Sequence, residues 1–251
     1  LMVGRSMENR FPPNEHVVQP NVLLKVENFT SADPHSFKGM SFDLHKGEIL
    51  GIGGLVGAQR TELVESVFGL RSIAEGKLYK NGQEIVNSNP QEAIKNGFAM
   101  LTEERRATGI IPMLSVMDNT LAVAFKAMAG NRFGILNPKK LQTDVEKING
   151  ELNVKTPSVK TAIQNLSGGN QQKVLICRWL LANSDILILD EPTRGIDVGA
   201  KYEIYRIMRE LTKAGKSIIM VSSEMPELIG VSDRIMVMCE GRMTGILDAA
   251  E

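Results

Sequence analysis

Hydrophobic and polar residues alternate in some stretches of the chain, and in others the hydrophobic ones recur at helical spacing. Residues 22–26 and 40–44 alternate, and residues 49–53 form a short apolar run, so all three are predicted to be strands. From Thr61 onward, apolar residues recur every three or four positions until Gly69. This predicts a helix that directly follows the third strand.

The middle of the chain changes from strand-like to helical patterning. Asn81-Gly82, between two short strand-like stretches, is a strong signal for a two-residue hairpin. Residues 90–95 are predicted to form a helix, and residues 98–101 a strand. Residues 113–152 have helical periodicity, many Met and Ala, and no convincing strand. We therefore predict a helical subdomain over about 113–165.

The last third of the chain alternates helices with apolar strands. The predicted helices are 167–182, 198–213 and 226–229, and the predicted strands are 186–189, 217–221, 234–239 and 243–247. Buried strands that are apolar throughout and separated by helices are typical of a parallel sheet. The predicted fold class is therefore α/β, with a mainly parallel core sheet and an antiparallel side sheet made from the early hairpins.

Composition narrows the possible functions further. The chain has 251 residues, 29 Lys and Arg against 29 Asp and Glu, and 43% hydrophobic residues, as expected for a globular domain. The charge balance disfavours a nucleic-acid partner, and no apolar run is long enough for direct insertion into lipid. Two cysteines do not make a disulfide framework. We predict a proline-containing linker over 1–21, one domain over 22–248 and a tail over 249–251.

An eight-residue segment between the third strand and the following helix has the frame of a phosphate-binding loop. That pattern ends in Gly-Lys-Ser/Thr, and its backbone N–H groups and helix N-terminus cradle phosphate oxygens. Here Gln59 replaces the last glycine, and Arg60 replaces the lysine. A strand-to-helix turn with incidental glycines is the alternative interpretation. The candidate nucleotide-binding residues are Gly54, Leu55, Val56, Gly57, Ala58, Gln59, Arg60, Thr61 and Glu62.

Two carboxylates follow an apolar strand later in the chain. Asp190 and Glu191 come directly after Ile186–Leu189. Ligands of α/β proteins bind beyond the carboxyl ends of the strands, where Asp190 would hold Mg²⁺ and Glu191 would polarise a water molecule. A buried strand that ends in a solvated acidic turn is the alternative.

A Ser-Gly-Gly sequence opens the helix that precedes this acidic strand. Free backbone N–H groups at such a helix N-terminus suit a phosphate, whereas a simple N-cap is the alternative. The candidate residues are Ser167, Gly168, Gly169, Asn170 and Gln171.

The order of four segments resembles the nucleotide-binding domain of ABC-type ATPases. These segments are the phosphate loop, LSGGN, the apolar run ending in Asp-Glu, and Gly195-Ile196-Asp197. The resemblance covers about 22–248. The segments TEERR, LSGGNQQK and EPTRGIDVGAK are similar to bacterial sugar-import ATPases that fuse two such domains in one polypeptide, and most of all to the C-terminal half of galactose/methyl galactoside importers. The opening segment resembles the connection between those two halves.

The resemblance implies that two nucleotide-binding domains meet head to tail, with each ATP between the phosphate loop of one and the signature of the other. The expected cofactors are ATP and Mg²⁺, with Thr61, Glu103 and Asp190 near the metal. Glu191 and Ser223 would be the catalytic residues, although Ser223 stands where the family usually has a histidine. Ser167, Gly168, Gly169, Asn170, Gln171 and Asp197 would face the ATP of the partner domain.

The departures from the family pattern concern the ATP site built on this chain's own loop. They are Gln59, Arg60, Glu103, Ser223 and the absence of an aromatic residue suited to stack on adenine, since neither Phe29 nor Phe37 aligns well. We therefore predict a degenerate site of its own and an intact signature donated to the partner.

The expected partners are an N-terminal ABC domain of the same polypeptide, membrane permease subunits and, indirectly, a periplasmic sugar-binding protein. The expected location is the cytoplasmic face of the bacterial inner membrane, as a peripheral protein. Three alternatives remain: a fully active ATPase domain, an ABC protein of DNA repair or translation, and an α/β domain that binds no nucleotide.

Overall fold

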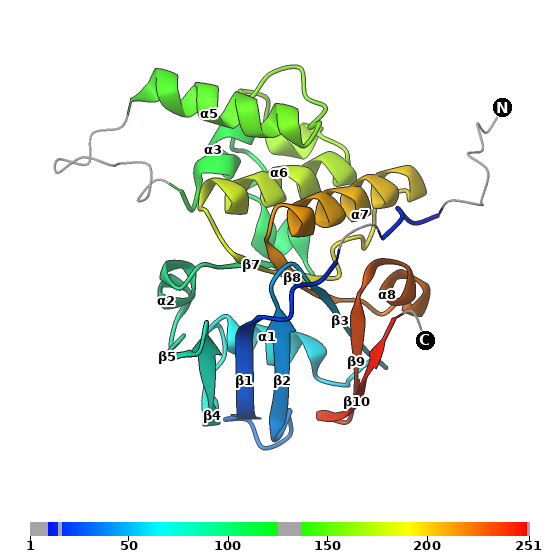
Figure 1. Ribbon diagram of the computed structural model, residues 1–251. Coiled ribbons are helices and arrows are strands. Elements are labelled where there is room, and N and C mark those ends of the chain that lie inside the picture. Colours follow the sequence, from blue (N-terminus) through cyan, green and yellow to red (C-terminus); the bar gives the residue numbers. More distant parts are fainter. Residues whose placement is uncertain (1–9, 15–16, 125–136, 250–251) are drawn as a thin grey trace.

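Two sheets form the core of the protein in the computed structural model, which describes residues 10–14, 17–124 and 137–249 (Figure 1). The larger sheet has the order β10-β9-β3-β8-β7-β6, and all its neighbours are parallel except the edge pair β9 and β10. This agrees with the predicted, mainly parallel sheet. Its strands are β3 (Ile49–Gly54), β6 (Phe98–Leu101), β7 (Ile186–Asp190), β8 (Ser217–Val221), β9 (Arg234–Cys239) and β10 (Arg242–Asp248).

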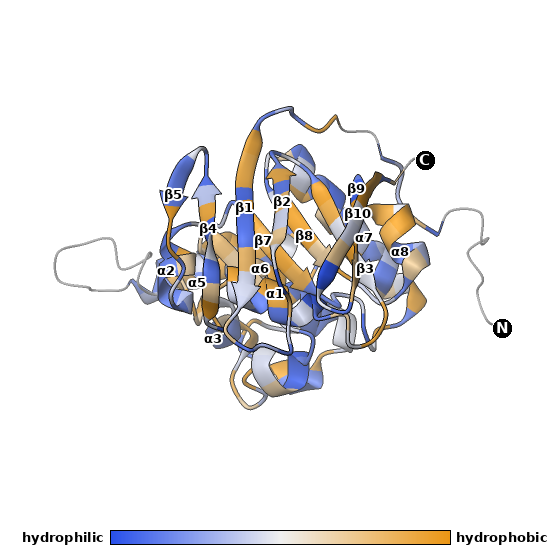
Figure 2. Ribbon diagram, turned by 90° about the horizontal axis from the view of Figure 1, so that it is seen from below, coloured by the Kyte–Doolittle hydropathy of each residue, from blue (hydrophilic) through white to orange (hydrophobic). Residues whose placement is uncertain are grey.

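The central strands are apolar because both of their faces are covered. Every residue of β7 and β8 is buried, and Figure 2 shows the hydrophobic colour running along both strands. Burial on two faces explains why these segments are continuous apolar runs and do not alternate.

The smaller sheet is antiparallel, as the early hairpins predicted, with the order β2-β1-β4-β5. Asn81 and Gly82 have φ values of 52° and 77°, as a two-residue hairpin turn requires. Its first strand is longer than predicted, because the pairing with β4 continues past residue 26 across two irregularities in register. The strands are β1 (Val22–Ser31), β2 (Met40–His45), β4 (Ile73–Lys80) and β5 (Gln83–Ile85).

The helices form layers around the larger sheet. Helices α6 and α7 pack over it, and α3 and α5 lie beyond α6 as a separate helical layer (Figure 1). No strand occurs among the described residues of 113–165, as predicted, while 125–136 lie outside the described residues. The helices are α1 (Arg60–Val67), α2 (Pro90–Lys95), α3 (Val116–Leu121), α5 (Pro138–Glu151), α6 (Gly168–Leu181), α7 (Val198–Lys213) and α8 (Met225–Val231).

Part of the predicted linker packs against the domain. The Phe11 ring lies 5.4 Å from the Tyr205 ring of α7, between ring centroids. It also covers Gly230 of α8 so closely that a Cβ built there would stand 2.3 Å from a ring carbon. Residues 1–9 and 15–16 of the predicted linker, and 250–251 of the predicted tail, lie outside the described residues.

Candidate functional site

The segment from Gly54 to Thr61 joins the carboxyl end of β3 to α1, as a phosphate-binding loop must. A Cβ at Gly54 would lie 2.5 Å from the Met238 carbonyl oxygen, so the loop starts where a side chain has no room. Gly57 has a φ of 85°. Leu55 and Val56, at the tip of the loop, are 83% and 96% exposed, and Glu62 lies in the first turn of α1.

Gln59 has the left-handed backbone that its position demands, with φ 69° and ψ 30°. Such a backbone costs a residue with a Cβ about 1 kcal/mol relative to glycine. Its side chain is held on both sides: Oε1 accepts a bond from the Ser36 hydroxyl at 2.9 Å, and Nε2 donates to the Gly57 carbonyl at 3.2 Å. The structure thus has a positive φ at the position where Gln59 replaces the last glycine of the pattern.

Arg60 reaches away from the loop to the end of β8. Its Nη1 donates to the Ser222 carbonyl at 2.8 Å. The guanidinium group also acts on both acidic residues after β7, since its charge lowers the pKa of Asp190 and of Glu191 in opposition to burial. The positive charge of Arg60 therefore stays near the candidate phosphate-binding loop, but one N–H group of the guanidinium already bonds to the Ser222 carbonyl.

Asp190 ends β7 and is 1% exposed. Burial raises the pKa of its carboxyl to about 7, although the Thr61 hydroxyl and Arg60 act in the opposite direction. Within the described part of the chain, neither carboxylate oxygen has a hydrogen-bond partner of ordinary geometry. Buried oxygens without a donor fit a cation, which makes Thr61 and Asp190 suitable ligands for Mg²⁺.

Glu191 follows in a left-handed conformation, with φ 46°, and its N–H donates to the Val221 carbonyl at 2.9 Å. Burial raises the pKa of its carboxyl, and a hydrogen bond from the Ser223 side chain partly offsets that rise. The structure thus brings both predicted catalytic residues, Glu191 and Ser223, into contact.

Glu103 lines a cleft that also contains Thr61. It is ion-paired with Arg194, which follows β7 on the same loop as Glu191. In the described ranges, no group of three or more His, Cys, Asp or Glu residues could hold a metal ion by itself. A contact of Glu103 with Mg²⁺ therefore stays a prediction, and it would require Arg194 to give up this partner.

Neither aromatic candidate for stacking on adenine is accessible. Phe29 and Phe37 are 2% and 0% exposed and belong to the hydrophobic core. The absence of a ring suited to stack on adenine stays a prediction.

The signature loop is held by close backbone packing. A Cβ at Gly169 would lie 2.6 Å from the Ala200 Cβ, and one at Gly168 would meet Arg105 Nη2 at 2.9 Å. Ser167 is exposed, and its hydroxyl accepts a bond from the Asn170 amide at 2.9 Å. The two glycines let α6 approach α7, and the loop presents Ser167 to the surface.

Gln171 has a buried side chain. It is 2% exposed and donates to the carbonyls of Ile163 and Leu166, at 3.2 and 3.1 Å. The amide supports the signature loop from below, and a contact of Gln171 with a partner's ATP stays a prediction. Asp197 is exposed and accepts a bond from the Ala200 N–H at 2.9 Å as the N-cap of α7. A contact of Asp197 across an interface stays a prediction.

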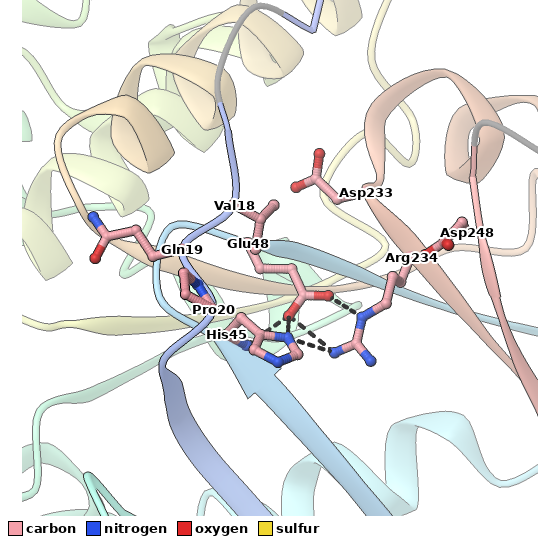
Figure 3. Close-up of a pocket in the computed structure, with 8 residues that line it drawn as sticks. All are labelled: Val18, Gln19, Pro20, His45, Glu48, Asp233, Arg234 and Asp248. Carbon is pink, nitrogen blue, oxygen red and sulfur yellow. Dashed lines mark hydrogen bonds and ion pairs between the residues drawn. The ribbon is translucent and has the colours of Figure 1, made fainter.

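Two clefts lie at opposite ends of the larger sheet. One, of about 610 Å³, adjoins Thr61 and Glu103 and extends to Trp179 of α6. The other, of about 280 Å³, lies at the amino ends of β3 and β9, where Glu48 is bonded to Arg234 (Figure 3). Only the first cleft adjoins the predicted nucleotide loop.

Sequence reasoning missed Arg194, Ser222 and Glu227. Arg194 pairs with Glu103, Ser222 accepts the bond from Arg60, and Glu227 accepts a bond from the Ser222 hydroxyl at 3.0 Å. The signal available was the segment EPTRGIDVGAK, which contains Arg194. Its tertiary partners lie too far away in sequence for local patterns to reveal.

A strand-to-helix phosphate loop, an acidic pair at the end of a neighbouring strand and a Ser-Gly-Gly helix opening together define an ATP-binding cassette. A sequence profile described as "ABC transporter" matches residues 37–194, so the chain belongs to the ABC transporter family. The fold agrees: a nucleotide-free ATP-binding cassette from an ABC transporter superposes with a TM-score of 0.78 at 20% identity, covering 90% of each chain.

Particular relatives are considerably more similar in sequence. The chain is 60% identical over 250 residues to the galactose/methyl galactoside import ATP-binding protein MglA of Clostridium tetani, and 51% identical over 251 residues to the MglA of Haemophilus influenzae. All of this chain is covered in both comparisons, but it spans only 49% of each relative. Within the ranges described, no helix has both the length and the apolar character needed to cross a bilayer.

Proposed function

We propose that this chain is a nucleotide-binding domain that energises ATP-dependent import of galactose or methyl galactosides. In this proposal it acts mainly as the donor of a signature to ATP held by another domain. Identities of 60% and 51% to two MglA proteins support the importer and its sugar class. The span of about half of each relative supports a partner ABC domain in the same polypeptide.

The single observation that carries the asymmetry is the state of the chain's own phosphate loop. Gln59 is held in a strained backbone and bound to Ser36, while Arg60 donates to the Ser222 carbonyl. The side chains of Gln59 and Arg60 would therefore already be bonded to other parts of this chain when ATP bound to the loop. The signature loop, by contrast, exposes Ser167 at the N-terminus of a 14-residue helix, which suits a phosphate from outside the chain.

The roles of individual residues follow from this proposal. Thr61 and Asp190 would hold Mg²⁺ when nucleotide binds, and Mg²⁺ would supply charge neutralisation at the phosphates. Glu191 would orient the attacking water, and Ser223 would remain hydrogen-bonded to Glu191. Ser167, Gly168, Gly169 and Asn170 would donate to the γ-phosphate of the partner's ATP, with Asp197 beside them.

The larger cleft supports a permease as the second partner. It adjoins Glu103. In the helical layer, Met113 is 76% exposed, while Met117 packs on a small core inside that layer. An exposed apolar side chain suits contact with a helix of a membrane subunit. The domain would then lie on the cytoplasmic face of the inner membrane, with a periplasmic sugar-binding protein acting through the permease.

The decisive test uses the complete natural polypeptide that contains this chain, assembled with its permease. Ser167→Glu places a negative charge where the γ-phosphate would lie, and transport-coupled ATP hydrolysis should fall about 100-fold, as for loss of a key oxyanion donor. Arg60→Ala should cost less than about three-fold, because Arg60 serves the degenerate site. A matched control is Ser158→Glu, at an exposed loop position outside the predicted site residues.

A fully active domain is the second candidate, and the intact set of Thr61, Asp190 and Glu191 is the observation that favours it. In that case, Arg60→Ala would abolish hydrolysis as completely as Ser167→Glu. An unchanged rate in Ser167→Glu would refute signature donation outright.

A further inference from the structure

A buried carboxylate outside the predicted site connects its two halves. Glu227 of α8 is 1% exposed and accepts hydrogen bonds from four side chains. The Thr193 hydroxyl donates to both carboxylate oxygens at 2.7 and 2.9 Å, Lys201 Nζ at 2.7 Å, the Tyr205 hydroxyl at 2.6 Å and the Ser222 hydroxyl at 3.0 Å. We call these five residues the Glu227 network.

The charges in the network are balanced. Burial alone would raise the pKa of Glu227, but bonds from Lys201, Tyr205 and Thr193 outweigh it and place the pKa below its ordinary range. Lys201 is itself shared between Glu227 and the more exposed Glu224, to which it donates at 2.6 Å. An ionised carboxylate held by four donors is a rigid connection, because its loss would leave buried donors such as the Tyr205 and Thr193 hydroxyls without this partner.

The donors come from three separate segments. Thr193 belongs to the loop after β7, Lys201 and Tyr205 lie one turn apart on α7, and Ser222 follows β8. Helices α7 and α8 and the ends of β7 and β8 therefore meet at one side chain. Thr193 and Lys201 both belong to the segment EPTRGIDVGAK.

Two of the connected segments carry predicted site residues. The loop of Thr193 also bears Glu191 and Asp197, and Ser222 is adjacent to Ser223. Ser222 uses its hydroxyl toward the network and its carbonyl toward Arg60. Glu227 therefore joins the two segments, in addition to the bonds that Glu191 makes to the Val221 carbonyl and to Ser223.

We propose that Glu227 is a positioning residue that holds the 191–197 loop and the 222–223 segment at a fixed separation, so that both segments move as one unit. Its effect on ATP turnover rests on the function proposed above. Its effect on the rigidity of the two segments does not, because that depends only on the bonds described. The two effects can therefore be tested separately.

The test compares Glu227→Gln with Glu48→Gln in the complete natural polypeptide. Both residues are buried carboxylates, with Glu227 1% and Glu48 0% exposed, and both have a cationic partner, but Glu48 lies at the opposite end of the sheet (Figure 3). Hydrogen exchange of peptides covering 191–197 and 222–226 should accelerate about ten-fold in both segments for Glu227→Gln, and in neither for Glu48→Gln.

Tyr205→Phe is the milder variant, because it keeps the ring against Phe11 and removes only one bond to Glu227. It should accelerate exchange in the same two segments about three-fold, which keeps the proposal testable if Glu227→Gln does not fold. In hydrolysis assays, Glu227→Gln should lower kcat about ten-fold and change KM for ATP less than two-fold.

The outcomes distinguish the two proposals. Exchange that is unchanged in both segments, or that rises equally in Glu48→Gln, overturns the positioning role whatever the hydrolysis rate. Paired acceleration in both segments, in a protein whose turnover does not depend on Ser167, supports the positioning role and refutes only the signature-donating function.

Discussion

Replacing Asp190 by asparagine should stabilise the folded protein above neutral pH, and it should weaken the Mg²⁺ binding proposed for this carboxylate. The carboxyl is 1% exposed and has a pKa of about 7, against an ordinary value of 3.8. That difference corresponds to as much as about 4 kcal/mol, which is the cost of keeping a buried charge in the folded state at pH 8. Asparagine is of similar size and carries no charge.

The sign of the pH dependence follows from proton binding. Between pH 4 and pH 7 the folded state holds a proton on Asp190 that the unfolded chain has lost, so the stability of the wild type falls as pH rises through this range. The asparagine variant lacks this titration. The stability difference between the two proteins should therefore be small near pH 4, grow up to about pH 7 and remain constant above it.

The assay is urea unfolding at pH 4.5, 6, 7 and 8 without nucleotide, for the wild type, Asp190→Asn and a control. Asp185→Asn is a suitable control because Asp185 precedes the same strand but its side chain is 50% exposed and pairs with Lys80. Our reasoning is refuted if Asp190→Asn is less stable than the wild type at pH 8, or if both proteins show the same pH dependence.

Three other predictions follow from packing and burial. Gln59→Gly should stabilise the fold by up to about 1 kcal/mol by relieving the positive φ, and should tighten nucleotide binding in calorimetric titrations; weaker binding would contradict it. Gly230→Ala should lower the free energy of unfolding by about 1–3 kcal/mol in the wild type but by much less in a Phe11→Ala background, so equal losses would disprove the contact. A thiol reagent should modify exposed Cys239 at once and Cys177 only on unfolding, as mass spectrometry can show, because burial raises the pKa of the Cys177 thiol.

Local sequence patterns predicted the elements well where burial imposes a clear period. The apolar run before Asp190 and the Asn81-Gly82 turn both indicated the structure that is found. Position in the loop was informative as well: the frame from Gly54 to Thr61 placed Gln59 where the pattern has a glycine, and the backbone there has a positive φ.

What could not be predicted arises from contacts between distant segments. Gln171 occupies a signature position, yet the packing of α6 turns it inward. The pairing of Glu103 with Arg194 depends on how β6 and β7 align in the sheet, and the meeting of Thr193 and Ser222 at Glu227 depends on how β7 and β8 align. No local periodicity encodes that alignment.

The contact between Phe11 and Gly230 has a practical consequence for protein engineering. A transplanted segment starting at residue 22 would leave Tyr205 and the bare backbone of Gly230 uncovered, as an apolar notch open to water. Chimeras that exchange this domain between transporters should therefore begin at residue 10, so that Phe11 is kept together with the surface of Tyr205 and Gly230 that it covers.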